Sequence, residues 1–210
     1  MRSMSTYELG GRASQKARTR AALVSAARDL VAAGTTPTVE DAAEAASISR
    51  TTAYRYFPTK RALLLAAHPE IAATSMLPDD PPDGAPERLD AVVHNFSAMI
   101  VETEPQQRTM LRLSLEATPA EREALPLRQG RAIAWIAEAL EGVRGDFTEA
   151  QFRQLVISIR ATVGIEALVW LVDVAGLTRH DAVALTRWSA QALLQRATSV
   201  APPTPQASTS

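Results

Sequence analysis

The stretch TPTVEDAAEAASISRTTAYRYFPTKR, residues 36–61, decides the fold of the first third of the chain. Thr38 is followed by Glu40 and Asp41, and this order predicts a helix start. A threonine side chain can cap free backbone amides, and acidic groups suit the positive end of the helix dipole. Small alanines follow at helical spacing, which favours close packing against a second helix. The stretch is therefore expected to open with a short, tightly packed helix.

A second short helix is predicted after a tight turn. Ser49 is a natural N-cap, and Pro58 marks the end because proline cannot continue a helix. Between them the sequence reads RTTAYRYF, residues 50–57. Ala53 and Phe57 are four positions apart, so both can face the core. The side chains left on the other sides include no carboxylate: Arg50, Thr51, Thr52, Tyr54, Arg55 and Tyr56.

These outward groups are guanidinium, hydroxyl and phenol donors, which bind phosphate oxygens and base edges in a major groove. The alternative interpretation is a solvated face on a small core helix, which is the commoner case for an arbitrary helix. Two arginines and two tyrosines weaken that alternative. A third helix is expected from Lys60 and Arg61, with Thr59 as its cap. Cations at a helix start cost about 0.3–1 kcal/mol each, and a nearby phosphate would reverse the sign of that effect.

This order of residues resembles the helix-turn-helix of TetR-family transcriptional regulators. The pattern is a threonine, an alternating apolar and acidic helix, a tight turn, Ser-Arg-x-Thr, Tyr-x-(His or Tyr)-Phe and Pro-x-Lys, and it runs here from Thr38 to Lys60. The resemblance implies that the DNA backbone is held by Thr38, Thr52, Tyr54 and Lys60. It implies that the residues nearest the bases are Arg50, Thr51 and Tyr56. Ser49, which caps the reading helix, completes the expected DNA-binding set.

Two positions depart from the pattern of this family. Ser47 stands where a glycine is usual, which costs about 1 kcal/mol of strain if the backbone there has positive φ. Arg61 stands where an acidic residue is common, and it is expected to make this edge of the domain more basic. Neither change removes the expected binding surface.

The charges along the 210 residues are unevenly distributed. Residues 1–68 hold ten Lys or Arg and five Asp or Glu, net +5, and the remaining residues hold twelve and eighteen, net −6. Only the first third therefore favours a polyanion as partner. There is no cysteine, and the three histidines lie far apart in sequence, so we expect no metal and no cofactor.

The whole chain reads as all-α, in two domains with flanking segments. We expect a disordered N-terminal arm over residues 1–13, a helix-turn-helix domain over 14–68, a helical ligand-binding and dimerisation domain over 69–197, and a disordered tail over 198–210. The proline-rich run LPDDPPDGAP, residues 77–86, is the expected junction between the two bodies.

The last two predicted helices indicate a homodimer. Residues 152–175 read as one helix with apolar residues on most faces, which must be covered on most faces. The final helix, starting at Thr178, carries a stripe that a monomer has little left to cover: Val183, Leu185, Trp188, Ala192 and Leu193. We expect these two helices to form a four-helix interface with their copies. No stretch is expected to cross a membrane and no secretory signal is visible, so the cytoplasm is the expected location.

The resemblance further implies a repressor that binds a palindromic double-stranded DNA operator and is released by a small-molecule effector. A mostly apolar effector is all that the composition suggests. Polar or aromatic residues set in the apolar helices are weak candidates for the pocket lining, because each is also an ordinary core or ion-pair residue: His94, Met99, Arg112, Glu116, Trp135, Arg160, Glu166 and Trp170.

Two other classes of protein compete with this interpretation. An enzyme would need a nucleophile with a base, a carboxylate pair, a phosphate-binding glycine loop or metal-ligand spacing, and the sequence offers no such constellation. A helical adaptor without effector control would bind DNA weakly and with little dependence on salt. A DNA-binding regulator would lose affinity steeply as salt rises, because phosphate contacts release counterions.

Overall fold

The structure is a computed structural model that describes residues 6–68, 73–118 and 130–204, with side chains from residue 14 onward. Within these ranges all regular elements are helices, which confirms the all-α fold. The chain divides into two compact units. The first comprises Met1–Glu70 and Pro105–Pro126, and the second comprises Ile71–Glu104 and Leu127–Ser210. The described residues 105–118 thus group with the first unit, although the sequence analysis placed them in the second domain.

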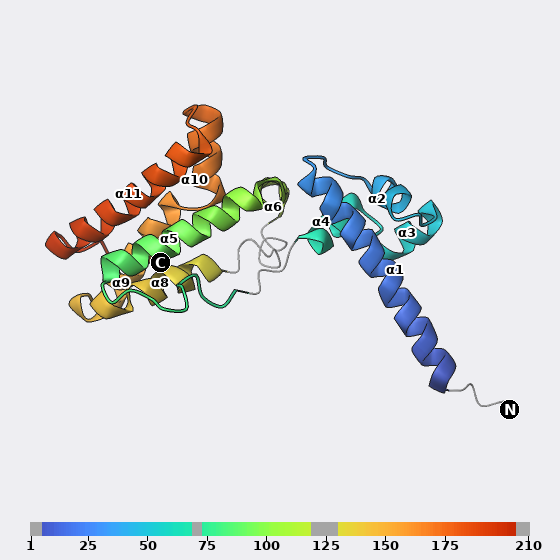
Figure 1. The fold of residues 1–210 in the computed structure, drawn as a ribbon, viewed down its shortest axis with the longest axis horizontal. Helices are drawn as coiled ribbons and strands as arrows, with labels where there is room; N and C mark the ends of the chain where they lie inside the picture. Colours follow the sequence, from blue (N-terminus) through green and yellow to red (C-terminus); the bar gives the residue numbers. More distant parts are fainter. Residues whose placement is uncertain (1–5, 69–72, 119–129, 205–210) are drawn as a thin grey trace, which may run out of the picture. The chain divides into compact units, whose positions relative to one another are not determined.

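The first unit is built on a long helix against which two short helices pack, and a third short helix packs on one of these two (Figure 1). The elements are α1 (Thr6–Ala32), α2 (Val39–Ala45), α3 (Arg50–Tyr56) and α4 (Lys60–Ala67), and most of α6 (Glu104–Glu116) belongs to the same unit. Leu23, Ala42 and Leu63 are fully buried at the centre of their core. The small alanines of α2 and α3 let these helices approach closely, as their spacing predicted.

Helix α1 begins at Thr6, eight residues before the predicted start at Ser14. Gly10 and Gly11 led to the expectation of a disordered arm over residues 1–13. Glycine lowers helix stability by about 1 kcal/mol relative to alanine but permits helical backbone angles, so the pair does not end the helix. Residues 1–5 of the expected arm lie outside the described residues.

The second unit is a bundle in which α11 packs on α5 and α9, and α8 packs on the same two helices (Figure 1). Its elements are α5 (Ala85–Glu102), α8 (Arg131–Ala139), η2 (Glu141–Asp146), α9 (Glu149–Thr162), α10 (Ile165–Val169), η3 (Trp170–Val174) and α11 (Arg179–Ser199). The core side chains include Leu89, Phe96, Ile136 and Ile159. Of the expected tail, residues 205–210 lie outside the described part of the chain.

The prediction of one continuous helix over residues 152–175 is wrong. Val163 is extended and Gly164 has φ of 117° and ψ of −173°, so the helix breaks into α9 and α10. That combination of angles is open essentially to glycine alone. After α10 the chain widens into η3, a single π-helical turn. The break lies between apolar segments, where hydrophobic periodicity carries no signal for it.

Glu149–Val174 is also long and apolar enough to cross a membrane by length and composition alone. The sequence analysis expected no stretch to cross a membrane, and length and composition alone do not confirm that expectation. In the most apolar part of this stretch, 44% is buried within the second unit. The helix is interrupted at Val163 and Gly164, and core helices of soluble proteins pass the same test. The finding is weak evidence for a membrane span.

Candidate nucleic-acid interface

The helix starts of the first unit form as the local sequence predicts. The Thr38 side chain accepts a hydrogen bond from the Asp41 amide at 3.1 Å, and the Asp41 carboxylate accepts one from the Thr38 amide at 2.8 Å. Ser49 Oγ accepts from the Thr52 amide, and Thr59 Oγ1 caps α4 in the same way. These bonds fix where α2, α3 and α4 begin, and so they fix which face α3 turns to solvent.

The turn between α2 and α3 adopts the strained conformation considered above. Ser47 has φ of 54°, and among the residues with described backbones it is the one non-glycine residue with positive φ. Its amide donates to the Glu44 carbonyl, and the Ile48 amide donates to the Ala43 carbonyl. The two bonds close the end of α2 and redirect the chain into α3.

Helix α3 turns most of its expected DNA-binding groups to solvent. Arg50, Thr51 and Arg55 are exposed, and so is Tyr54, while Ala53 is fully buried. Tyr56 differs from the expectation of an exposed phenol, because it is half-buried and packs against the core around Phe57. Thr38 and Thr52 are also half-buried, whereas Ser49 and Lys60 are exposed.

A carboxylate from the neighbouring helix lies against α3. Glu40, in the first turn of α2, forms an ion pair with Arg50 and accepts a hydrogen bond from the Tyr54 hydroxyl at 2.7 Å. The Arg50 guanidinium carbon lies 6.0 Å from the centre of the Tyr54 ring, within cation–π range. The hydrogen bond from Tyr54 is the main cause that lowers the pKa of Glu40, and the same bond raises the pKa of Tyr54.

Sequence reasoning missed this role of Glu40. It treated Glu40 only as a favourable charge at the start of α2, and α3 itself has no carboxylate. Glu40 is ten residues before Arg50 and fourteen before Tyr54, so the contact depends on how two helices cross. A periodicity within one helix carries no signal for such a pair.

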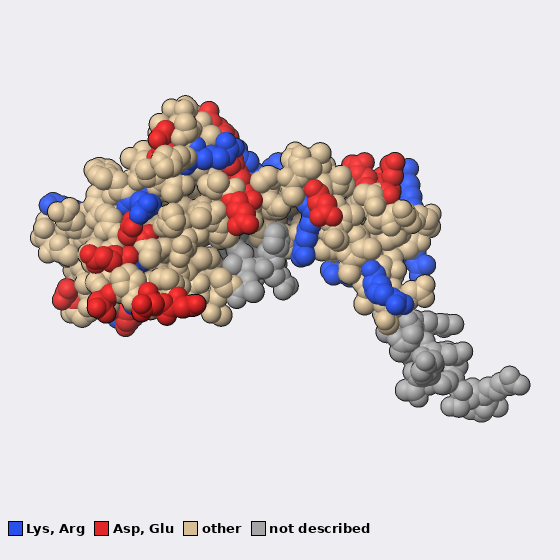
Figure 2. Space-filling model, in the orientation of Figure 1, with Lys and Arg blue, Asp and Glu red and all other residues tan. Residues whose placement is uncertain are grey.

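Arg61 does not contribute to the basic edge as expected. It is half-buried, and its Nη1 donates a hydrogen bond to the Leu113 carbonyl of α6 at 3.3 Å. The group turns toward α6 within the first unit. The exposed cation of the α4 start is therefore Lys60. In the view of Figure 2, Lys and Arg side chains of the first unit are interspersed with acidic ones, while acidic side chains gather along one edge of the second unit.

A small helical unit with a capped, solvent-facing α3 that carries arginine, threonine and tyrosine donors defines a helix-turn-helix DNA-binding protein. Its two short helices, α2 and α3, are joined by the turn at Ser47, and α1 and α4 complete the core beneath them.

A comparison with protein-family models agrees with this class. Residues 23–67 match the family model described as bacterial regulatory proteins, tetR family, and the match runs from the second half of α1 to the end of α4. A comparison with curated proteins finds no match. Residues 23–67 thus form a DNA-binding domain similar to that of tetR-family regulatory proteins, which supports a DNA-binding transcriptional regulator.

The structure brings together some of the expected effector-binding residues of the second unit. Arg160 Nη2 lies 3.3 Å from Glu166 Oε2, and its guanidinium lies over the Phe96 ring, which meets Trp135 edge to face. Trp135 is buried and donates through Nε1 to the Thr74 carbonyl. Trp170 is 58% exposed and shares an open pocket with Glu166.

The remaining candidates do not join that group. His94 is exposed on α5, beside the Asp90 carboxylate, and Met99 is half-buried on the same helix. Arg112 and Glu116 are exposed on α6, in the part of that helix that belongs to the first unit. The eight residues therefore do not line one cavity among the described residues.

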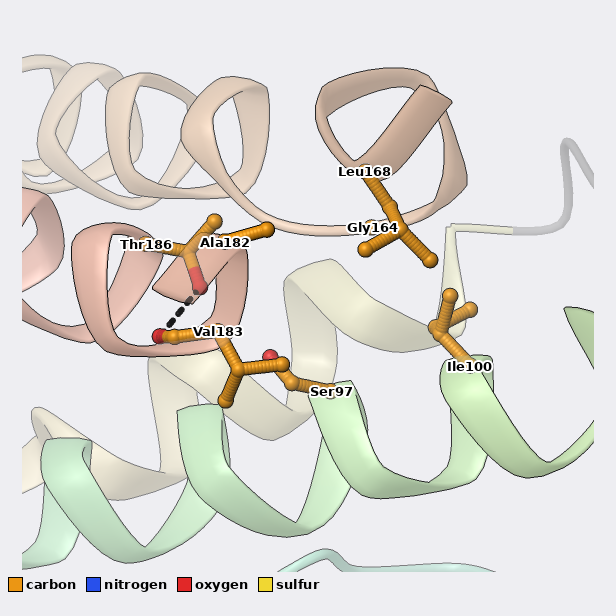
Figure 3. A pocket seen from close by; sticks show the side chains of 7 residues that line it. All are labelled: Ser97, Ile100, Gly164, Leu168, Ala182, Val183 and Thr186. Carbon is orange, nitrogen blue, oxygen red and sulfur yellow. Dashed lines mark hydrogen bonds between the residues drawn. The ribbon is translucent and has the colours of Figure 1, made fainter. Parts of the chain in front are cut away.

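Two cavities of the second unit differ greatly in size. Figure 3 shows the smaller one, between α5, α10 and α11, where the Thr186 hydroxyl donates to the Val183 carbonyl. Its volume is about 10 Å³, room for one water molecule at most. The larger is an open pocket of about 380 Å³ beside Trp170 and Leu185, with Glu166 and Ser189 on its wall. Only the larger one approaches the size that a small organic molecule needs.

Proposed function

We propose that this protein is a ligand-responsive repressor that binds a palindromic operator as a homodimer. The observation that carries the DNA-binding part is the exposed set of donors on α3, held on a unit whose helix starts are fixed by side-chain caps. On DNA, α3 would enter the major groove, with Arg50 and Thr51 toward the bases. Thr38, Tyr54 and Lys60 would hold phosphates. Tyr56, being half-buried, would reach bases only through its exposed edge.

The dimer is supported by exposed apolar side chains on η3 and α11. Val174 is 70% exposed, Trp188 is 68% exposed and Leu185 is 40% exposed, while the inward face of α11 is made of smaller residues such as Ala182 and Ala190. Large apolar groups left in water mark an interaction surface. A second copy of the same surface would cover them about a two-fold axis, and two α3 helices could then reach successive major grooves about 34–36 Å apart.

Release by an effector would follow from a population shift. A small, mostly apolar compound that binds better to a dimer with its reading helices at the wrong separation would draw the protein away from DNA, by no more than its differential affinity. The group around Trp135, Arg160, Glu166 and Trp170 is the part of the second unit that we propose as its site. The cytoplasm is the proposed location of such a regulator. The competing adaptor function predicts DNA binding that is weak and insensitive to salt.

The test uses two single substitutions in the DNA-reading surface. Arg50→Ala should change which sequences are preferred, because it removes a base contact, at a cost of about 1–3 kcal/mol on the preferred site. Lys60→Ala should weaken binding to all duplexes alike. It should also make the slope of log K against log salt shallower by about 0.9, the value for one phosphate contact. Arg18→Ala, an exposed cation of α1 that carries none of the proposed contacts, is the control. If both variants bound as tightly as the parent, the proposed residue roles would be wrong.

A further inference from the structure

We propose that Glu40 is a specificity-determining residue of the DNA interface. It holds Arg50 and Tyr54 in one arrangement, and it withholds one positive charge from indiscriminate binding to phosphates. The inference rests on the proposed DNA-binding function and deepens it, because it concerns how that same surface distinguishes one duplex from another.

The geometry is a closed triangle of three side chains from two helices. One carboxylate oxygen of Glu40, Oε1, accepts hydrogen bonds from both Arg50 Nη2 and the Tyr54 hydroxyl. Arg50 in turn lies over the Tyr54 ring. The Glu40 side chain is 30% exposed, whereas that of Arg50 is 72% exposed. Glu40 thus contacts the guanidinium of Arg50 at Nη2 alone. Arg50 has five N–H donors, and most of them still face solvent.

This arrangement contributes little to the stability of the unit. Helices α2 and α3 are already joined by the Ser47 turn and by the buried contacts around Ala43, Ala53 and Phe57. An ion pair exposed to solvent contributes little to folding, because water and salt screen its charges. A carboxylate next to bound DNA is also repelled by the phosphates, so Glu40 costs affinity. Glu40 therefore contributes neither stability nor affinity, and the property left for it to affect is the sequence specificity of DNA binding.

Restraint and neutralisation both favour discrimination. A free arginine has a long flexible side chain and can follow any phosphate, and such contacts supply nearly all non-specific affinity. The Glu40 carboxylate partly neutralises the charge of the Arg50 guanidinium and holds that side chain in one direction. A duplex with a base edge in that direction gains the contact without the entropy cost of ordering the side chain. Other duplexes must break the triangle to gain a phosphate contact.

The test compares Glu40→Gln with Glu44→Gln. Glu44 is an exposed carboxylate on the same helix, outside the triangle, so both variants remove one negative charge. The probes are a duplex selected from a random library by the parent protein and an unrelated duplex of equal length. For Glu40→Gln we expect affinity for the unrelated duplex to rise about threefold to tenfold, with a salt slope steeper by about 0.9. The ratio of selected to unrelated affinity should fall at least fivefold.

Glu44→Gln should shift both affinities by the same factor and leave the ratio unchanged. In an Arg50→Ala background, Glu40→Gln should no longer lower the ratio, because it acts through Arg50. Glu40→Asp retains the charge but is one methylene shorter. It should lower the ratio and steepen the salt slope less than Glu40→Gln does, because a carboxylate stays near Arg50, and it keeps the test intact if the glutamine variant fails to fold.

Two outcomes would overturn the inference, and they can be told apart. If Glu40→Gln and Glu44→Gln shift both affinities equally and leave the ratio intact, Glu40 is an ordinary surface charge and the proposed DNA-binding function stands. If the parent enriches no duplex from the library, the proposed function fails and this inference fails with it.

Discussion

Ser47 carries the chain from α2 into α3 at a φ of 54°, where a side chain adds strain that glycine would avoid. Ser47→Gly is therefore expected to raise the stability of the first unit by about 0.5–1 kcal/mol, even though glycine increases the entropy of the unfolded chain. The measurement is hydrogen exchange of the buried amides of α2 and α3, which reports the free energy of opening in this unit.

Ala45→Gly is the matched control for this substitution. Ala45 is exposed at the end of α2 in ordinary helical conformation, so the same glycine should lower stability there by about 0.5–1 kcal/mol. If Ser47→Gly lowered stability as Ala45→Gly does, the assignment of strain at Ser47 would be wrong.

At the residue scale, local chemistry was the most predictable part of the chain. The caps at Thr38, Ser49 and Thr59 form as their sequence spacing predicted, because a cap depends on residues three positions apart. The direction of Arg61 and the partners of Glu40 were not predicted, because both depend on a neighbouring helix.

At the scale of elements, the break between α9 and α10 depends on one glycine. A Cβ on Gly164 would lie 2.8 Å from Arg160 Nη1 and 3.2 Å from Glu166 Oε2, and φ of 117° is unfavourable for any side chain. Gly164→Ala should destabilise the second unit by about 1–3 kcal/mol. Chemical denaturation followed through tryptophan fluorescence reports this unit, because all three tryptophans lie in it.

The control for this prediction is Gly142→Ala in η2, where an added Cβ meets no atom within 4 Å and φ is not positive. That change should leave the denaturation midpoint nearly unaltered. A similar effect of the two substitutions would show that the break at Gly164 is not held by its backbone conformation.

Helices α5 and α11 are linked by the ion pair between Asp90 and Arg187, whose hydrogen bond is the main cause that lowers the pKa of Asp90. A group with a lowered pKa in the folded state stabilises the fold above its ordinary pKa of about 4, and this contribution is lost as the pH falls through the folded-state value. Asp90→Asn should therefore cost about 0.2–1 kcal/mol near pH 7, the range for a half-exposed pair.

The difference between parent and Asp90→Asn should shrink as the pH is lowered below about 4, measured as denaturation midpoints of the second unit at several pH values. A difference that grew with falling pH would contradict the assigned role of Asp90. The same carboxylate-to-amide change at exposed Glu87 of α5 is a charge-matched comparison on the same helix.

Element types and the core faces of the first unit followed from hydrophobic spacing, because each short helix buries one narrow face. Hydrophobic spacing does not predict helix ends where a segment is apolar on most sides, because one helix and two then give the same pattern. The break at Gly164 was missed for this reason. The predicted effector-binding residues were chosen for being polar within apolar helices, and exposure of His94, Arg112 and Glu116 shows that this criterion does not locate a cavity.

At the scale of the whole molecule, the dimer proposal makes a prediction about Trp188. Its side chain is 68% exposed on α11, so Trp188→Glu should leave the fold of one chain intact. Burial of a large aromatic in an interface is worth about 2 kcal/mol or more, so the variant should weaken self-association about 30-fold or more. Sedimentation equilibrium over a range of concentrations measures this change.

Leu115→Glu on α6 provides the comparison, because Leu115 is 67% exposed but belongs to the first unit. It should leave the association constant unchanged. Equal association of the parent and the Trp188 variant would show that the exposed stripe of α11 is not the interface.

The central claim is that a dimer of this chain reads DNA through α3, and footprinting tests it most directly. The DNA upstream of the coding region is probed at 50 mM and 200 mM salt. The account predicts protection of a two-fold-symmetric site, with affinity falling about 10³-fold or more between the two conditions, because several phosphates are contacted by each dimer. A folded dimer that protected no symmetric site, or bound with no dependence on salt, would contradict the account.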